Sequence, residues 1–221
     1  DVTLGAIEFG RLLAGAVLTE QIFTIPGFGK LIVDAVFNRD YPVVQGVVLA
    51  TALITGISGF TGRYLAQELR SAGYTVAGLS DVVEATSEAN EVFCCDLLDR
   101  AGLAEIVSRV KPEMVVHLAG IAFVADDNVD AIYRTHVVGT RNLLEAVAKS
   151  GCGPRSVLLA SSANIYGNAD AVPIDETTPA APANDYAVSK LAMEYMARLW
   201  FDQLPITLAR PFNYTGVGQS L

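Results

Sequence analysis

The sequence predicts an α/β fold, a doubly wound parallel sheet that is preceded by an apolar helical segment. From residue 52 onward, short apolar runs of strand length alternate with longer helical patterns. The spacing between these runs suits βαβ units, which place their strands in parallel. The composition is 52% hydrophobic, with a mean hydropathy of +0.39. Strands buried on both faces produce this balance, as would a soluble domain joined to a short membrane-like piece.

The charge and the cysteines exclude several classes of function. The net charge is −9 and no basic run occurs, so nucleic acid is not an expected partner. The spacing of Cys94, Cys95 and Cys152 matches neither a disulfide framework nor a zinc site. We therefore expect core thiols in a reducing compartment and no bound metal. The chain opens at Asp1 without a basic leader or a start methionine, which indicates no signal peptide and is consistent with a fragment.

An apolar window precedes the first predicted strand–helix unit. Residues 41–62 form 22 consecutive uncharged positions, more than the roughly 18 that a membrane span needs. The window ends in TGISGFTG, whose glycines each cost about 1 kcal/mol inside a helix. One helix therefore cannot occupy the whole window. Only residues 43–54 form a continuous apolar run, which is too short to cross a bilayer alone.

The stretch GAVLTEQIFTIPGFGKLIVDAVFNRDYPVVQG resembles the C-terminal part of the permease subunits of dipeptide and oligopeptide ABC transporters. The resemblance covers about residues 1–52 and implies membrane association through this segment. The coupling loop and the second half of the last span are missing, so we expect no transport. An amphipathic arm on a soluble enzyme is the alternative. We place a junction between Thr51 and Thr55, and expect an artefact or a degraded fusion rather than an intact gene fusion or recombinant.

The predicted second domain, residues 53–221, begins with a glycine turn. The strand ALIT leads into TGISGFTG, and the helix RYLAQELRSAG follows. Gly56, Gly59 and Gly62 allow a tight turn, close approach of a pyrophosphate, and packing of the helix on the strand, respectively. The helix N-terminus, next to Phe60, attracts phosphate. This strand–turn–helix context predicts a Rossmann-like cofactor domain.

The remaining elements continue the alternation. Helical patterns extend to about Lys111, over 129–151 and over about 184–203. With the first strand, the apolar runs make six predicted strands, the other five at residues 75–79, 91–99, 113–120, 156–162 and 206–213.

Three side chains suggest proton-transfer chemistry. Tyr186 and Lys190 are four residues apart and share one helix face, and Ser162 ends the preceding strand. A tyrosine and lysine at this spacing are usually only a solvated face; together with the serine and the glycine turn, they indicate a catalytic set. We expect the lysine charge and an oxidised nicotinamide to lower the tyrosine pKa from about 10. Tyr186 would then exchange a proton with a substrate oxygen that Ser162 holds.

These motifs resemble the extended short-chain dehydrogenase/reductases, the NAD-dependent epimerase/dehydratase family that acts on nucleotide sugars. The matching pieces are TGISGFTG, CDLLD, VVHLAG, VVGTRNLLEA, SSANIYG, DYAVSK and RPFN. The resemblance implies a catalytic set of Ser162, Tyr186 and Lys190, adenine contacts at Asp96 and Leu97, cofactor contacts at Ala119 and Gly120, and a sugar-nucleotide contact at Asn213.

The end, ARPFNYTGVGQS, is closest to the GDP-4-keto-6-deoxy-mannose reductases, with the GDP-mannose 4,6-dehydratases next. The resemblance implies a cytoplasmic enzyme that binds a nucleotide sugar, and its typical homodimer is not derivable from these residues. The family continues beyond Leu221, so we expect the substrate half to be largely missing. A permease fragment with an incidental domain, and a module that senses NAD(P)H without turnover, are alternative functions.

Two positions depart from the family pattern. His136 stands where asparagine is usual, and we expect it to pack beside the sheet and to disturb a local backbone or water contact. Ser80 stands where an acid usually binds the ribose, which leaves room for the 2′-phosphate of NADP. No arginine follows, and Asp81 would repel that phosphate. The cofactor is therefore NADP or NAD, with a slight preference for NADP.

Overall fold

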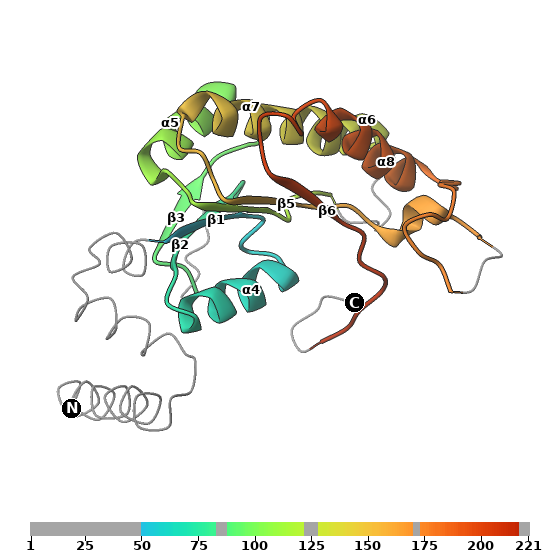
Figure 1. Ribbon diagram of the computed structural model, residues 1–221, viewed down its shortest axis with the longest axis horizontal. Coiled ribbons are helices and arrows are strands. Elements are labelled where there is room, and N and C mark those ends of the chain that lie inside the picture. The colour runs from blue at the N-terminus through green and yellow to red at the C-terminus, as the bar shows by residue number, and fades with distance from the viewer. Residues whose placement is uncertain (1–49, 83–87, 122–127, 170–172, 217–221) are drawn as a thin grey trace. The chain divides into compact units, whose positions relative to one another are not determined.

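A computed structural model describes residues 50–82, 88–121, 128–169 and 173–216 (Figure 1). These residues form a six-stranded sheet of order β3-β2-β1-β4-β5-β6, in which every neighbouring pair is parallel. The strands are β1 Thr51–Thr55, β2 Thr75–Ser80, β3 Glu91–Cys94, β4 Met114–His117, β5 Ser156–Ala160 and β6 Ile206–Ala209. The predicted fold is confirmed. The strand order reverses between β1 and β4, and this reversal opens a crevice at the carboxyl ends of the strands.

Helices cover both faces of the sheet (Figure 1). The helix α4 (Phe60–Ser71) lies on one face, against β1 and β2. On the other face lie α5 (Arg100–Val110), α6 (Val129–Tyr133), α7 (Thr140–Ser150) and α8 (Asp185–Arg198). A π-helical segment, η1 (Arg134–Gly139), joins α6 to α7, and a short 3₁₀ helix, η2 (Ala163–Tyr166), follows β5.

The strands bury side chains on both faces. Leu53, Val115 and Val157 belong to the larger apolar core, between the sheet and α5, α7 and α8. Their neighbours Ile54 and Val116 belong to the smaller core beneath α4. Alternate residues of one strand thus point to different cores, which explains why the strands are apolar throughout.

Several predicted boundaries were too generous. Helix α8 ends at Arg198, and residues 199–203 continue as tight turns in which Phe201 N donates to the Arg198 carbonyl. The predicted helix 129–151 contains the π-helical segment. Cys94 is exposed, so the prediction of three core thiols was wrong at this position. Its strand, β3, is the edge of the sheet and is covered less completely.

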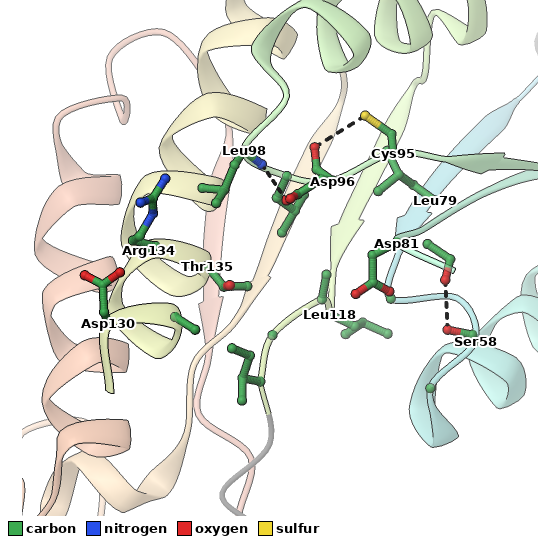
Figure 2. Close-up of a pocket in the computed structure, with 18 residues that line it drawn as sticks. Ser58, Leu79, Asp81, Cys95, Asp96, Leu98, Leu118, Asp130, Arg134 and Thr135 are labelled. Atoms are coloured by element: carbon green, nitrogen blue, oxygen red, sulfur yellow. Dashed lines mark hydrogen bonds between the residues drawn. The ribbon is translucent and has the colours of Figure 1, made fainter. Parts of the chain in front are cut away.

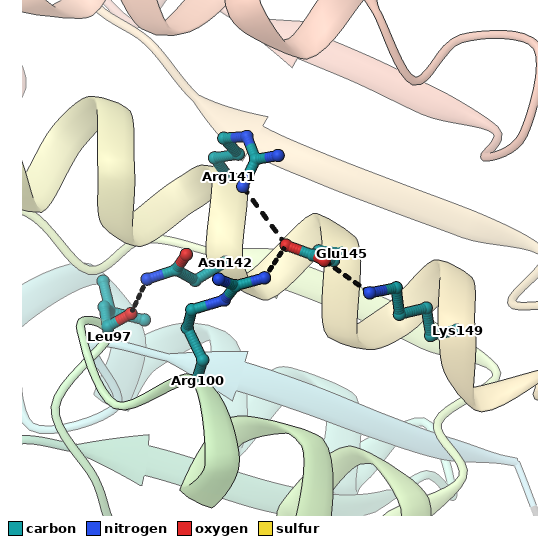
Figure 3. Close-up of polar contacts among 6 residues, drawn as sticks. All are labelled: Leu97, Arg100, Arg141, Asn142, Glu145 and Lys149. Carbon is teal, nitrogen blue, oxygen red and sulfur yellow. Dashed lines mark hydrogen bonds and ion pairs between the residues drawn. The ribbon is translucent and has the colours of Figure 1, made fainter.

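Polar contacts between α5 and α7 hold the loop after β3 in place (Figure 3). Buried Asn142 on α7 donates to the Leu97 carbonyl at 3.1 Å. Beside it, the Glu145 carboxylate pairs with Arg100, Arg141 and Lys149 at 2.8, 3.2 and 2.5 Å. These contacts fix the residues that follow β3 at the crevice.

Nearly all of the predicted permease-like segment lies outside the described residues. Among the helices that the structure describes, none has both the length and the apolar character that a membrane span requires.

Candidate active site

The turn after β1 requires glycine. Gly56 has φ +70°, and a Cβ there would lie 2.7 Å from the Ala119 nitrogen. A Cβ on Gly62, inside α4, would lie 2.3 Å from the Gly56 carbonyl oxygen. The backbone of Gly56 also donates to the Leu79 carbonyl at 2.9 Å. The turn is therefore held against β2 and against the loop after β4, as the sequence predicts for a nucleotide-binding turn.

The start of α4 is suited to an anion. Its N-cap, Gly59, offers no side-chain hydrogen bond, and the first turn contains no acidic residue. The first backbone N–H groups of a helix lack partners within the helix, and the helix dipole places positive charge there. Gly56, Ser58 and Gly59 line the adjoining pocket, so a dinucleotide pyrophosphate fits these residues.

The crevice contains a cavity of about 570 Å³ (Figure 2). This volume lies within the range of small-molecule sites. The predicted cofactor residues on its wall are Gly56, Gly59, Ser80, Asp96, Leu97, Ala119 and Gly120. Further wall residues that the sequence did not indicate include Ser58, Asp130, Arg134 and Thr135. Asp130 lies on α6, Arg134 and Thr135 lie on η1, and Ser58 lies between the glycines of the turn after β1.

Phe60 and Gly62 were also predicted at the cofactor but do not line this cavity. The Phe60 ring stacks with Tyr214 at 6.2 Å between centroids, and Gly62 is buried where α4 meets the glycine turn. Phe60 therefore contacts the segment after β6, and Gly62 allows α4 to pack against the glycine turn. Asn213, the predicted sugar-nucleotide contact, is exposed after β6 and is likewise absent from the cavity wall.

Ser80 is the last residue of β2 and is buried, whereas Asp81, which follows the strand, is exposed. The Ser80 hydroxyl is buried, lies 3.1 Å from Ser58 Oγ and accepts from the Val82 backbone at 3.3 Å. Asp81 is exposed, and its carboxylate lines the cavity. The acidic group at the end of β2 is thus Asp81, one residue beyond the expected position.

Ser162, Tyr186 and Lys190 come together at the carboxyl end of β5. Ser162 is buried, caps η2 by accepting from the Asn164 backbone at 3.2 Å, and hydrogen-bonds Tyr186. Helix α8 begins at the cap Asn184, whose side chain accepts from the Ala187 backbone at 2.8 Å. This start places Tyr186 in the first turn and Lys190 one turn later, as their spacing predicts.

Lys190 lies between the tyrosine and the cavity wall. Its ammonium donates to the Ala160 carbonyl at 3.0 Å and lies 5.9 Å from the centroid of the Tyr186 ring. A Cβ on Gly120, which lines the cavity, would lie 3.3 Å from Lys190 Nζ. Burial lowers the Lys190 pKa from 10.5 to about 8, so the side chain stays largely protonated at neutral pH.

Burial of Tyr186 opposes the lowering of its pKa that the lysine and an oxidised nicotinamide are expected to cause. Burial has the largest effect and raises the pKa, and the neighbouring Tyr214 phenol acts in the same direction. The hydrogen bond from Ser162 lowers it, but by less than burial raises it. The physical reason is that loss of water around the phenol disfavours the anion. The neutral phenol is therefore the resting form, suited to donate a proton.

His136 is fully buried beside these residues. Its Nε2 accepts from the Ile121 backbone at 3.0 Å, and its Nδ1 lies 2.8 Å from Ser189 Oγ. Its ring meets the Tyr186 ring edge-on at 5.5 Å. Burial and then the Lys190 charge lower its pKa to about 3. His136 thus makes a backbone contact of its own at the cavity wall, through Ile121.

The match to a protein-family model decides the family. The model of the NAD dependent epimerase/dehydratase family matches residues 52–220. The chain belongs to the NAD-dependent epimerase/dehydratase family. A second model, of the binding-protein-dependent transport system inner membrane component, matches residues 2–70. Within that match, residues 52–70 form β1 and most of α4 in the structure, so they belong to the epimerase/dehydratase domain.

Individual relatives of this epimerase/dehydratase chain carry different names. A GDP-6-deoxy-D-talose 4-dehydrogenase from Aggregatibacter actinomycetemcomitans is 33% identical over 76% of this chain and 54% of its own length. A GDP-6-deoxy-D-mannose reductase from Pseudomonas aeruginosa is 34% identical over 75% of this chain and 53% of its own. The chain therefore spans about half the length of the curated relatives that it matches.

Solved structures of the family share the fold. A presumed epimerase from Burkholderia cenocepacia is 49% identical, with a TM-score of 0.71 over 77% of this chain and 56% of the other. The UDP-glucose 4-epimerase of Brucella ovis, solved with NAD, is 29% identical, with a TM-score of 0.68 over 74% of this chain and 52% of the other. The relatives thus include both reductases and epimerases.

Proposed function

We propose that this chain is the cofactor-binding and catalytic part of an NAD(P)-dependent oxidoreductase that reduces the 4-keto group of a 6-deoxy sugar nucleotide. The main support is the placement of Tyr186, hydrogen-bonded to Ser162 and close to Lys190, beside a cavity of dinucleotide-binding character. The names of the two GDP-6-deoxy-sugar relatives favour this substrate class.

The proposed chemistry assigns one role to each side chain. The nicotinamide, when bound, supplies a hydride to the C4 carbon. Tyr186 donates its phenolic proton to the O4 oxygen, so the C=O bond becomes H–C–O–H and the phenolate remains. Ser162 holds O4 by a hydrogen bond, and the Lys190 charge stabilises the phenolate. Proton donation agrees with the raised pKa of Tyr186, which keeps the phenol protonated until hydride transfer.

The proposed cofactor is NAD in preference to NADP. Ser80 had favoured NADP, but its hydroxyl lies 3.1 Å from Ser58 Oγ, and the exposed acidic residue Asp81 lines the cavity beside it. A carboxylate accepts hydrogen bonds from ribose hydroxyls and repels a 2′-phosphate. Arg134 is the one basic side chain among the described wall residues, and it lies near Asp130, away from Asp81 (Figure 2).

Epimerisation is the second candidate within the same family. It is favoured by the 49% identity to the presumed Burkholderia epimerase and by the likeness to a UDP-glucose 4-epimerase. A 4,6-dehydratase would use the same tyrosine and cofactor site. The same residues at the carboxyl ends of the strands can therefore serve either reaction, and the substrate that binds determines which reaction occurs.

Cofactor titration and turnover together test the proposal. Nicotinamide fluorescence of the purified whole chain should show saturable NADH binding. NADH oxidation should then depend on a GDP-linked 4-keto-6-deoxy hexose. Tyr186→Phe should reduce the rate by 10²–10⁴-fold and leave NADH binding unchanged. Tyr195→Phe, at an exposed site on the same helix, is the control. UDP-glucose conversion without net NADH oxidation would favour the epimerase instead.

We also propose two parts for the chain, a permease-like segment over 1–52 and the cofactor domain over 53–221. The transport-component match to residues 2–70 supports the first part. Partition of the whole chain between membrane and supernatant after detergent-free lysis tests its membrane association. Recovery entirely in the supernatant would contradict that association and would leave the oxidoreductase proposal intact.

A further inference from the structure

His136 connects two parts of the site that the catalytic set does not join directly. At Nε2 it accepts from Ile121, on the cavity wall, and at Nδ1 it meets Ser189 on α8. Ser189 Oγ in turn donates to the Tyr186 carbonyl at 2.7 Å. The chain of contacts therefore runs from the cofactor cavity to the backbone of the proposed proton donor.

The direction of each hydrogen bond is fixed by the backbone at both ends. The Ile121 N–H can only donate, so His136 Nε2 is without a proton. The Tyr186 carbonyl can only accept, so the Ser189 hydroxyl proton points toward it. The oxygen of Ser189 is left to accept from Nδ1–H of His136. The imidazole is therefore neutral and protonated at Nδ1.

The surroundings of the ring agree with a neutral imidazole. The charged or titratable groups that face it are Lys190 and Tyr186 on α8 and His117 on β4. A cation among them would be repelled by the Lys190 ammonium. The ring also packs closely, because a Cβ on Gly120 would lie 2.9 Å from Nε2. Its position is thus set by sterics as well as by hydrogen bonds.

We propose that His136 is a positioning residue, which as the Nδ1-protonated imidazole sets the placement of Tyr186 relative to the cofactor wall through Ser189. The part of this proposal that concerns activity rests on the proposed role of Tyr186. The geometric part does not, because it concerns only His136, Ile121 and Ser189. The two ring nitrogens of His136 reach Ile121 and Ser189 at once.

The tautomer can be measured without turnover. The chain contains only two histidines, so ¹⁵N-histidine labelling gives two imidazole spin systems, and His136→Asn identifies the one that disappears. We expect His136 to show a protonated Nδ1 and a bare Nε2, and no change between pH 5 and pH 8. A protonated Nε2, or titration of this ring near pH 6.5, would overturn the proposal.

A double-mutant cycle tests the positioning role. Ser189→Ala removes one hydroxyl, and His136→Phe keeps the ring but removes both polar atoms. We expect each to lower kcat by about tenfold, Ser189→Ala to leave the NADH Kd unchanged, and the double variant to be no worse than His136→Phe alone. His136→Asn should recover part of the loss. Independent losses that multiply in the double variant would contradict the connection and indicate packing alone.

The same variants distinguish a wrong proton-donor role of Tyr186 from a wrong positioning role of His136. If Tyr186→Phe retains the activity of the parent chain, the proton-donor role is wrong whatever the cycle shows. If Tyr186→Phe is inactive but Ser189→Ala is unchanged, the proposed function stands and the positioning role is wrong. Tyr195→Phe again serves as the control on α8, because its side chain is 60% exposed.

Discussion

Glu194 and Arg210 form a two-point ion pair between α8 and the end of β6, with Nε–Oε1 at 2.9 Å and Nη2–Oε2 at 2.6 Å. Glu194 is fully buried, and Arg210 also donates to the Tyr166 hydroxyl at 2.8 Å. Burial has the largest single effect and raises the Glu194 pKa, but the hydrogen bond of Arg210 and the charges of Arg210 and Arg198 contribute to a net lowering. The pair thus connects α8, β6 and η2 around the proposed catalytic residues.

Loss of the arginine should destabilise the domain strongly. Arg210→Met leaves the Glu194 carboxylate buried without a partner charge, which costs about 3–5 kcal/mol. Urea unfolding measures this loss. The matched control is Arg155→Met, which removes an exposed pair with Glu113 and should cost less than about 1 kcal/mol. Equal losses of unfolding free energy in the two variants would show that the buried pair stabilises the domain no more than the exposed pair does.

Gly56→Ala should damage both stability and cofactor binding. The new methyl group would collide with the Ala119 backbone at 2.7 Å, in addition to the strain of φ +70°. Gly151→Ala carries similar strain at φ +66° but meets nothing within 4 Å, so it should cost only about 1–2 kcal/mol. NADH titration distinguishes the two variants, because only Gly56→Ala should weaken NADH binding. Unchanged NADH affinity in Gly56→Ala would contradict the proposal that the turn after β1 binds the cofactor.

Asp81 should set the choice between the two nicotinamide cofactors. Asp81→Asn removes the charge that opposes a 2′-phosphate, and we expect the NADPH affinity to rise about tenfold relative to NADH, the effect of about 1.4 kcal/mol of repulsion. Asp130→Asn changes the same charge elsewhere on the cavity wall and should leave the ratio nearly unchanged. A parent chain that already prefers NADPH would contradict the assignment.

The two histidines should make the domain sensitive to acid. Burial, followed by the Lys190 charge, lowers the pKa of both His117 and His136 to about 3. Between pH 6.5 and 3 the unfolded chain therefore binds protons that the folded chain does not, so stability falls as the pH falls. Each histidine contributes at most about 1.4 kcal/mol per pH unit.

Urea unfolding between pH 4.5 and 7 checks this dependence. His136→Asn should remove the contribution of one histidine and make the curve shallower than that of the parent. Carboxylate groups contribute equally to both proteins, so the difference between the curves isolates the histidine. Parallel curves would show that His136 is protonated to the same extent in the folded and unfolded states.

Most elements of the fold could be predicted from the sequence because each depends on residues that are close together in the chain. The apolar strands, the glycine turn and the tyrosine–lysine spacing each depend on neighbours in sequence, and the structure shows each in its expected place. The placement of Ser162 beside Tyr186 also followed, because both positions lie at the carboxyl edge of a parallel sheet.

Long-range partners could not be predicted in the same way. The contacts of His136 with Ile121 and Ser189 span 15 and 53 residues, and no spacing marks such pairs. The raising of the Tyr186 pKa by burial could not be predicted, because desolvation depends on tertiary packing, which a motif does not reveal. The contact between Ser80 and Ser58 likewise spans 22 residues, and no spacing marks it.

The π-helical segment determines which way the following helix faces. Each residue of an α-helix advances about 100° around the axis. In α7 this rotation places Leu143, Leu144 and Val147 in the core and leaves Glu145 among surface cations. Deleting one residue from 134–139 would move each residue of α7 to the position of the residue before it, so the Glu145 carboxylate would take the buried position of Leu144. Evolution can therefore exchange side chains in this stretch, such as exposed Val138, far more freely than it can change the length of the stretch.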